Sequence, residues 1–200
     1  MEAITALLSG FPADMPGIVI AQHMPPVFTG LFAERLNRTV PMKVAEAKNG
    51  DCVVPGKVLI APGGYQTRIV RSFGSCTIGN VTGDRPTVCA YHIQCARGEN
   101  MKGYCPSIEL LFDSIAENAG PNAIGVILTG MGKDGALGLL RMKKAGARTI
   151  AQNESSSVVY GMPKAALEIG GAEKSVHINY MAAHILGMLH EMQRNVITNR

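Results

Sequence analysis

The stretch Gly125-Val-Ile-Leu-Thr-Gly-Met-Gly-Lys-Asp-Gly-Ala-Leu-Gly138 decides the fold class. The apolar run over residues 123–128 predicts a buried strand, because parallel strands covered on both faces read as continuous hydrophobic segments. A glycine-rich turn follows over 129–135, and residues 136–145 then repeat apolar side chains with the helical period and stop at Gly146. Strand, glycine turn and helix in this order are typical of α/β proteins, which bind ligands beyond the carboxyl ends of their parallel strands.

A histidine and an aspartate stand at the ends of two such strands. Residues 17–22 form a second apolar run that ends at His23, and residues 28–37 then predict an amphipathic helix. Asp134 lies in the first turn of the helix predicted after the glycine turn, where the helix dipole stabilises its charge. We expect the two side chains to meet in one crevice, where Asp134 would fix the imidazole tautomer of His23. The alternative is an Asp134 that caps its own helix and a His23 that is an ordinary surface residue.

The rest of the chain continues the alternation of strands and helices. It predicts a three-layer α/β/α fold with a mostly parallel, doubly wound sheet and a small antiparallel hairpin. The hairpin is assigned to residues 65–71 and 75–81, which alternate in polarity around Gly74. Further strands are expected over 42–45, 57–61, 148–151 and 174–177, helices over 107–118, 164–169 and 181–193, and a frayed tail over 195–200.

Composition fits a packed domain and argues against several protein classes. The 200 residues suit one domain, and 46% of them are hydrophobic. No apolar run approaches the ~20 residues that span a bilayer, so we expect no membrane insertion. The net charge of +4 is spread along the chain without a Lys/Arg run, which argues against a nucleic-acid partner. A nucleotide-binding α/β protein is a weak alternative, because the dinucleotide-binding and Walker glycine motifs are both missing.

Four potential zinc ligands lie close together in the sequence. Cys89, His92, Cys95 and Cys105 are of the right types for a tetrahedral site. Their spacing lacks the C-x2-C knuckle of standard zinc motifs. The favoured alternative is a set of reduced cysteines that pack as small hydrophobic side chains, so we predict no metal and no cofactor.

Six separate motifs, in register along the chain, resemble the CheB-type catalytic domain of chemotaxis protein-glutamate methylesterases. The resemblance implies hydrolysis of glutamate γ-methyl esters on chemoreceptors, often with deamidation of receptor glutamines, in the bacterial cytoplasm. It also implies two partners, the cytoplasmic region of a methylated chemoreceptor and a receiver domain in cis or in trans. The motifs are Gln22–Pro26, Phe32–Leu36, Pro55–Gly56 with Ile60–Gly63, Leu128–Gly138, Thr149–Glu154 and Val158–Pro163.

The same resemblance assigns roles to single residues within a catalytic domain over 1–194. It makes His23 the general base, Asp134 its orienting carboxylate and the Met131 backbone N–H an oxyanion donor. Family members begin with a strand and a Gly-x-Ser-x-Gly-Gly turn that carries the nucleophile. Residues 1–8 of this chain align with the helix after that turn, and Ser9 lies near the far end of the helix, where it cannot replace the nucleophile.

We therefore expect this chain to lack the first strand and the nucleophilic serine of the family. Truncation, a start placed too late and a true loss of catalysis are the open explanations, and the intact type of the other motifs favours incompleteness. The functional alternative is a non-catalytic receptor-binding protein of the same fold.

One segment departs from the family pattern. Members carry His/Arg-Pro-Ser-Val-Asp, whereas this chain reads Tyr104-Cys-Pro-Ser-Ile-Glu109. Basic residues that would line the substrate cleft are missing at positions 104 and 105, and Glu109 replaces the aspartate. We expect this departure to change substrate contacts more than the fold.

Overall fold

The computed structural model describes residues 1–72, 89–98 and 104–198. The chain consists of two compact units, each with more contacts within itself than with the other. Unit 1 contains residues 1–12, 39–41 and 108–200, and unit 2 contains residues 13–38 and 42–107.

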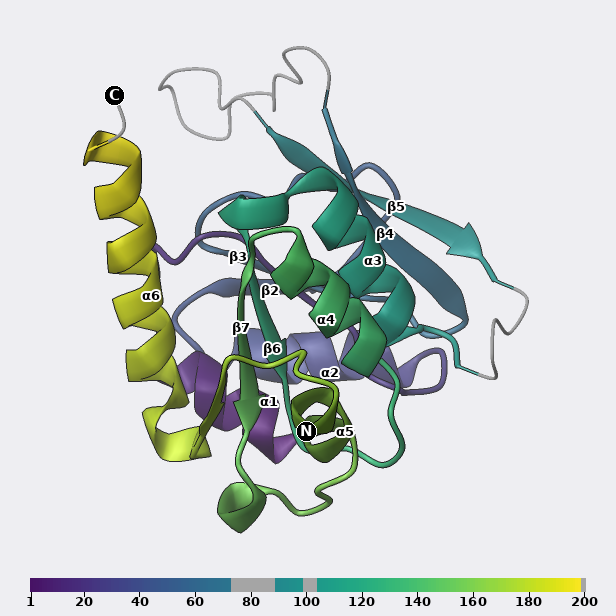
Figure 1. Ribbon diagram of the computed structural model, residues 1–200. Coiled ribbons are helices and arrows are strands. Elements are labelled where there is room, and N and C mark those ends of the chain that lie inside the picture. Colours follow the sequence, from purple (N-terminus) through teal and green to yellow (C-terminus); the bar gives the residue numbers. More distant parts are fainter. Residues whose placement is uncertain (73–88, 99–103, 199–200) are drawn as a thin grey trace. The chain divides into compact units, whose positions relative to one another are not determined.

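Unit 1 is built on a three-stranded parallel sheet in the order β6-β7-β8 (Figure 1). Its central strand is buried on both faces over residues 149–152, and three helices pack against that strand. The strands are β6 (Ile124–Ile127), β7 (Arg148–Gln152) and β8 (Lys174–Val176), and the helices on β7 are α4 (Ala136–Lys144), α5 (Met162–Glu168) and α6 (Ile178–Thr198). Helix α1 (Glu2–Ser9) packs on α6, and α3 (Ile108–Asn118) packs along α4.

Unit 2 contains a second three-stranded parallel sheet, in the order β1-β3-β2. The strands are β1 (Ile18–Ile20), β2 (Lys43–Glu46) and β3 (Lys57–Ile60), and β3 is fully buried over residues 58–60. Helix α2 (Phe28–Asn37) packs on β2 and β3 through Thr29, Phe32, Ala33 and Leu36, which are buried at helical spacing. The periodicity predicted this helix with the bounds that the structure has.

The antiparallel pair of unit 2 has a different second strand from the predicted hairpin. Strand β4 (Tyr65–Arg71) pairs with β5 (Tyr91–Arg97). Residues 75–81, the predicted partner, lie outside the described residues. Strand β5 was not predicted, because Ile93 is its only buried residue and the strand therefore carries a weak hydrophobic signal.

Parallel strands flanked by helices, with a small antiparallel pair, confirm the predicted fold class. Several helix boundaries differ: α5 begins at residue 162 instead of 164, and α6 begins at residue 178 and continues through residues 195–198, which the sequence assigned to a frayed tail. Two short 3-10 turns complete the described secondary structure, at Gly120–Asn122 and Glu154–Ser156. None of the described helices is long and apolar enough to cross a membrane.

Candidate functional site

In the turn after β6 the backbone N–H of Gly130 is hydrogen-bonded within the fold, and the N–H of the next residue has no such partner in the described chain. The Gly130 N–H donates to the Val159 carbonyl at 3.0 Å. The next residue, Met131, is 81% exposed, and its N–H donates to no residue within the described ranges. Gly132 has a φ of 84°, in the left-handed region that glycine adopts without steric cost. The turn therefore presents a backbone donor at the carboxyl end of a parallel strand.

A buried amide supports the start of this turn. Gln152, at the end of β7, is 1% exposed. Its Oε1 accepts from the Thr129 N–H at 2.8 Å, and its Nε2 donates to the Ser156 carbonyl at 2.7 Å. Because both ends of the amide are satisfied, the side chain ties the end of β6 to the segment after β7.

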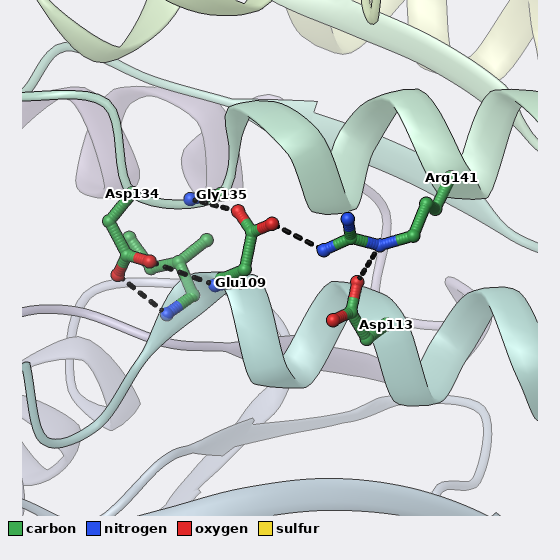
Figure 2. Close-up of polar contacts among 6 residues, drawn as sticks. Glu109, Asp113, Asp134, Gly135 and Arg141 are labelled. Atoms are coloured by element: carbon green, nitrogen blue, oxygen red, sulfur yellow. Dashed lines mark hydrogen bonds and ion pairs between the residues drawn. The ribbon is translucent and has the colours of Figure 1, made fainter. Parts of the chain in front are cut away.

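Asp134 is buried and caps α3 (Figure 2). Its Oδ2 accepts from the Ile108 N–H at 2.8 Å, and its Oδ1 accepts from the Glu109 N–H at 3.1 Å. These are two of the N–H groups that a helix start leaves without an intrahelical partner. The alternative role considered for Asp134, capping its own helix, is wrong, because the N-cap of α4 is Gly135 in the left-handed conformation. A residue 26 positions further along the chain therefore caps α3.

Glu109 makes the reciprocal interaction from α3 to α4. Its Oε2 accepts from the Gly135 N–H at 3.1 Å, and its Oε1 pairs with the Arg141 guanidinium. Arg141 also donates to Asp113 at 2.5 Å, and these carboxylates, Asp113 first, raise the pKa of Arg141 (Figure 2). The two helices lie side by side with their N-termini together, so each receives a carboxylate from the other segment. Two positive helix-dipole ends therefore meet at Asp134 and Glu109.

His23 lies in unit 2, three residues beyond the end of β1, and is half-buried. Its imidazole stacks on the ring of Tyr104, with the ring centroids 4.4 Å apart and the planes 11° from parallel. Asp134 and Met131 belong to unit 1. The assignment of His23, Asp134 and Met131 to one catalytic site stays a prediction.

The structure does not gather the four candidate zinc ligands, Cys89, His92, Cys95 and Cys105, into one cluster within the described residues. Within residues 1–72, 89–98 and 104–198, no group of three or more His, Cys, Asp or Glu side chains is placed to hold a metal ion. His92 and Cys95 are three residues apart on β5, so their side chains point to opposite faces of the strand. His92 instead contacts the Ser72 Oγ at 3.0 Å. Burial raises the thiol pKa of both Cys95 and Cys105, which disfavours the thiolate that a metal needs.

The sequence profile of the CheB methylesterase family matches residues 1–185. The chain belongs to the CheB methylesterase family. The protein-glutamate methylesterase/protein-glutamine glutaminase of Syntrophotalea carbinolica is 49% identical over 190 residues, which are 95% of this chain and 50% of that protein. The protein-glutamate methylesterase/protein-glutamine glutaminase 2 of Syntrophomonas wolfei is 48% identical over 191 residues, which are 96% of this chain and 52% of that protein. The chain thus spans about half the length of these CheB relatives.

A solved CheB structure extends the match to three dimensions. The crystal structure of the Thermotoga maritima CheB methylesterase catalytic domain superposes with a TM-score of 0.81 at 30% sequence identity. The match covers 94% of this chain and 92% of the Thermotoga chain. The resemblance that the sequence motifs indicated is confirmed at the level of family and fold.

Three residues outside the predicted set of His23, Met131 and Asp134 contact these residues or support the segments that carry them. Gln152 holds the turn that precedes Met131, Glu109 caps the helix start next to Asp134, and Tyr104 stacks on His23. For Glu109 a signal was present in the sequence, because an acidic residue in the first turn of a helix is favoured by the dipole. Thr129, which Gln152 holds, and His23, on which Tyr104 stacks, lie 23 or more residues from these side chains in the chain, beyond the reach of local patterns.

Proposed function

We propose that this chain carries the base, the orienting carboxylate and an oxyanion donor of a protein-glutamate methylesterase and glutaminase. The substrate is the γ-methyl ester of a glutamate side chain, or the amide of a glutamine, on the cytoplasmic region of a chemoreceptor. One observation in unit 1 supports this most directly. Asp134 is buried with both oxygens held by backbone N–H groups, and the exposed Met131 N–H lies in the same turn. A fixed carboxylate beside an available donor suits acyl transfer.

In the proposed reaction a serine oxygen attacks the γ-carbonyl carbon while His23 takes the serine proton. The carbonyl oxygen becomes an oxyanion and accepts a hydrogen bond from the Met131 N–H. His23 then gives the proton to the leaving methoxide or amide nitrogen, so methanol or ammonia departs and an acyl-enzyme remains. Water, deprotonated by His23, hydrolyses the acyl-enzyme and restores the serine. Asp134 orients the imidazole and stabilises the imidazolium throughout.

The proposal includes a statement about the nucleophile. None of the serines in the 200 residues lies in a Gly-x-Ser-x-Gly turn. We propose that the 200-residue polypeptide alone releases no methanol above background, and that a polypeptide extended at its N-terminus by the family strand and serine turn does. Action in the cytoplasm and control by a receiver domain, in cis or in trans, belong to the same proposal.

The test is methanol release from a methylated chemoreceptor fragment, measured for the chain alone and for the extended polypeptide. In the extended form His23→Ala should abolish turnover, and His177→Ala, a histidine placed after β8, should leave it unchanged. Turnover by the unextended chain that His23→Ala abolishes would refute the statement about the nucleophile. Receptor binding without turnover in both forms would favour the alternative, a non-catalytic receptor-binding protein.

A further inference from the structure

The imidazole of His23 stacks closely on the ring of Tyr104, with the two ring planes nearly parallel. Its centroid lies 4.4 Å from that of Tyr104, and the two planes differ by 11°. Stacked aromatic rings attract each other beyond the area that they bury. The second His–Tyr pair of the described chain, His177 with Tyr180, is 5.8 Å apart and tilted by 53°. The stack in unit 2 therefore restricts the imidazole plane more than an ordinary neighbouring tyrosine does.

A buried amide holds the backbone at the Tyr104 carbonyl and three residues later, at Ser107. Gln66, from β4, is 7% exposed. Its Nε2 donates to the Tyr104 carbonyl at 2.9 Å, and its Oε1 accepts from the Ser107 N–H at 2.9 Å. Gly98 leaves room for this side chain, since a Cβ at that position would lie 2.4 Å from the Gln66 Cγ. One side chain thus clamps the segment at two points, and a fixed backbone presents the Tyr104 ring.

We propose that Tyr104 is a positioning residue for His23, an inference that rests on the proposed role of His23 as general base. The χ2 torsion of histidine is broad, so the imidazole plane needs restraint from its surroundings. A general base works only when its ring nitrogen is within hydrogen-bond reach of the proton that it takes. The Tyr104 ring, stacked on one face of the imidazole, limits rotation about χ2 of His23 and so raises the fraction of time in which the ring nitrogen points at the proton that it takes.

The face of the tyrosine ring serves the reaction in a second way. During turnover His23 becomes an imidazolium, and the negative face of an aromatic ring attracts a cation. Both effects need the ring and neither needs the phenol oxygen. The proposal therefore separates two substitutions, Tyr104→Phe, which keeps the ring, and Tyr104→Ala, which removes it.

The first measurement needs no catalysis. In the 200-residue chain, NMR of the His23 ring protons should show the ring-current shift of a stacked neighbour in the wild type and in Tyr104→Phe, and should lose it in Tyr104→Ala. Tyr180→Ala is the matched control and should change only the resonances of His177. Unchanged His23 resonances in Tyr104→Ala would overturn the proposal.

The second measurement uses the active polypeptide identified by the methanol assay. Tyr104→Ala should lower kcat by about three- to tenfold, the range expected for one aromatic stack, with KM changed less than about twofold. Tyr104→Phe and Tyr180→Ala should stay within about twofold of the wild type in both constants. A change in KM alone would make Tyr104 a substrate contact and overturn the positioning role. Absence of turnover from the unsubstituted polypeptide, with the stack intact by NMR, would instead refute the proposed function.

Discussion

Asp134→Asn is expected to weaken the fold as well as the proposed catalysis. Both carboxylate oxygens of Asp134 accept from backbone N–H groups, Ile108 at 2.8 Å and Glu109 at 3.1 Å. Asparagine keeps one acceptor oxygen and places an NH2 group against the other N–H, so one bond is lost and the remaining one loses its charge. A hydrogen bond to a charged group contributes about 1.5–3 kcal/mol, so we expect a loss of about 2–3 kcal/mol in the free energy of unfolding.

Urea unfolding and melting curves of the chain measure this effect. A loss of that size lowers the melting temperature of a chain of this length by about 5–10 °C. Asp113→Asn is the matched control, because the Asp113 ion pair with Arg141 is partly solvent-exposed and should cost less than about 1 kcal/mol. An Asp134→Asn chain that melts within 2 °C of the wild type, or no lower than Asp113→Asn, would refute the reasoning. In the active polypeptide, turnover is compared at a temperature where both variants are folded, and near wild-type kcat/KM for Asp134→Asn would remove Asp134 from the mechanism.

Gly138→Ala should destabilise the chain by about 1–3 kcal/mol, because its Cβ would lie 2.7 Å from a side-chain atom of α3. Gly187→Ala, which meets nothing within 4 Å on α6, should instead stabilise it by up to about 1 kcal/mol, and urea unfolding of both decides the point. Cys105 should react slowly with iodoacetamide at pH 7 and faster at alkaline pH, because burial raises its pKa; a pH profile equal to that of an exposed cysteine peptide would contradict this. Hydrogen bonding to Arg148 lowers the pKa of Glu191, so this pair stabilises the fold above about pH 4.5 and loses its effect as the pH falls through the folded pKa. The melting temperatures of the wild type and Arg148→Ala should therefore converge as the pH falls below 4.5, and a constant difference would show that the pair contributes nothing.

Sequence periodicity predicted the helices and parallel strands well because their apolar side chains face a covered sheet. Helix α2 has the predicted bounds, and α4 ends one residue before the predicted Ala145. The partner predicted for β4, residues 75–81, lies outside the described residues, and the strand that pairs with β4 was not predicted. Strand β5 pairs with β4 through its backbone and fully buries only Ile93, so its hydrophobic signal in the sequence is weak.

The candidate site was predictable only in part, because its supporting contacts are long-range. The glycine turn and the two strand ends were visible as local patterns, which led to His23, Met131 and Asp134. The sequence did not show that the Asp134 carboxylate binds the start of α3, because capping rules pair such a residue with the helix that directly follows it in the chain. Glu109 was interpreted as an altered substrate contact, whereas the partners found for it are Gly135 and Arg141.

The exchange of carboxylates between α3 and α4 makes the position of Asp134 depend on a helix other than its own. A slide of α3 by one residue, about 1.5 Å along its axis, would carry both N–H donors away from the carboxylate. A slide of α4 would carry the carboxylate away from the donors. The Asp134 side chain therefore fixes the position of α3 relative to α4 along the helix axes. A displacement of α3 would therefore reach the turn that holds Met131 through the hydrogen bonds of Asp134 and through the Glu109–Gly135 hydrogen bond.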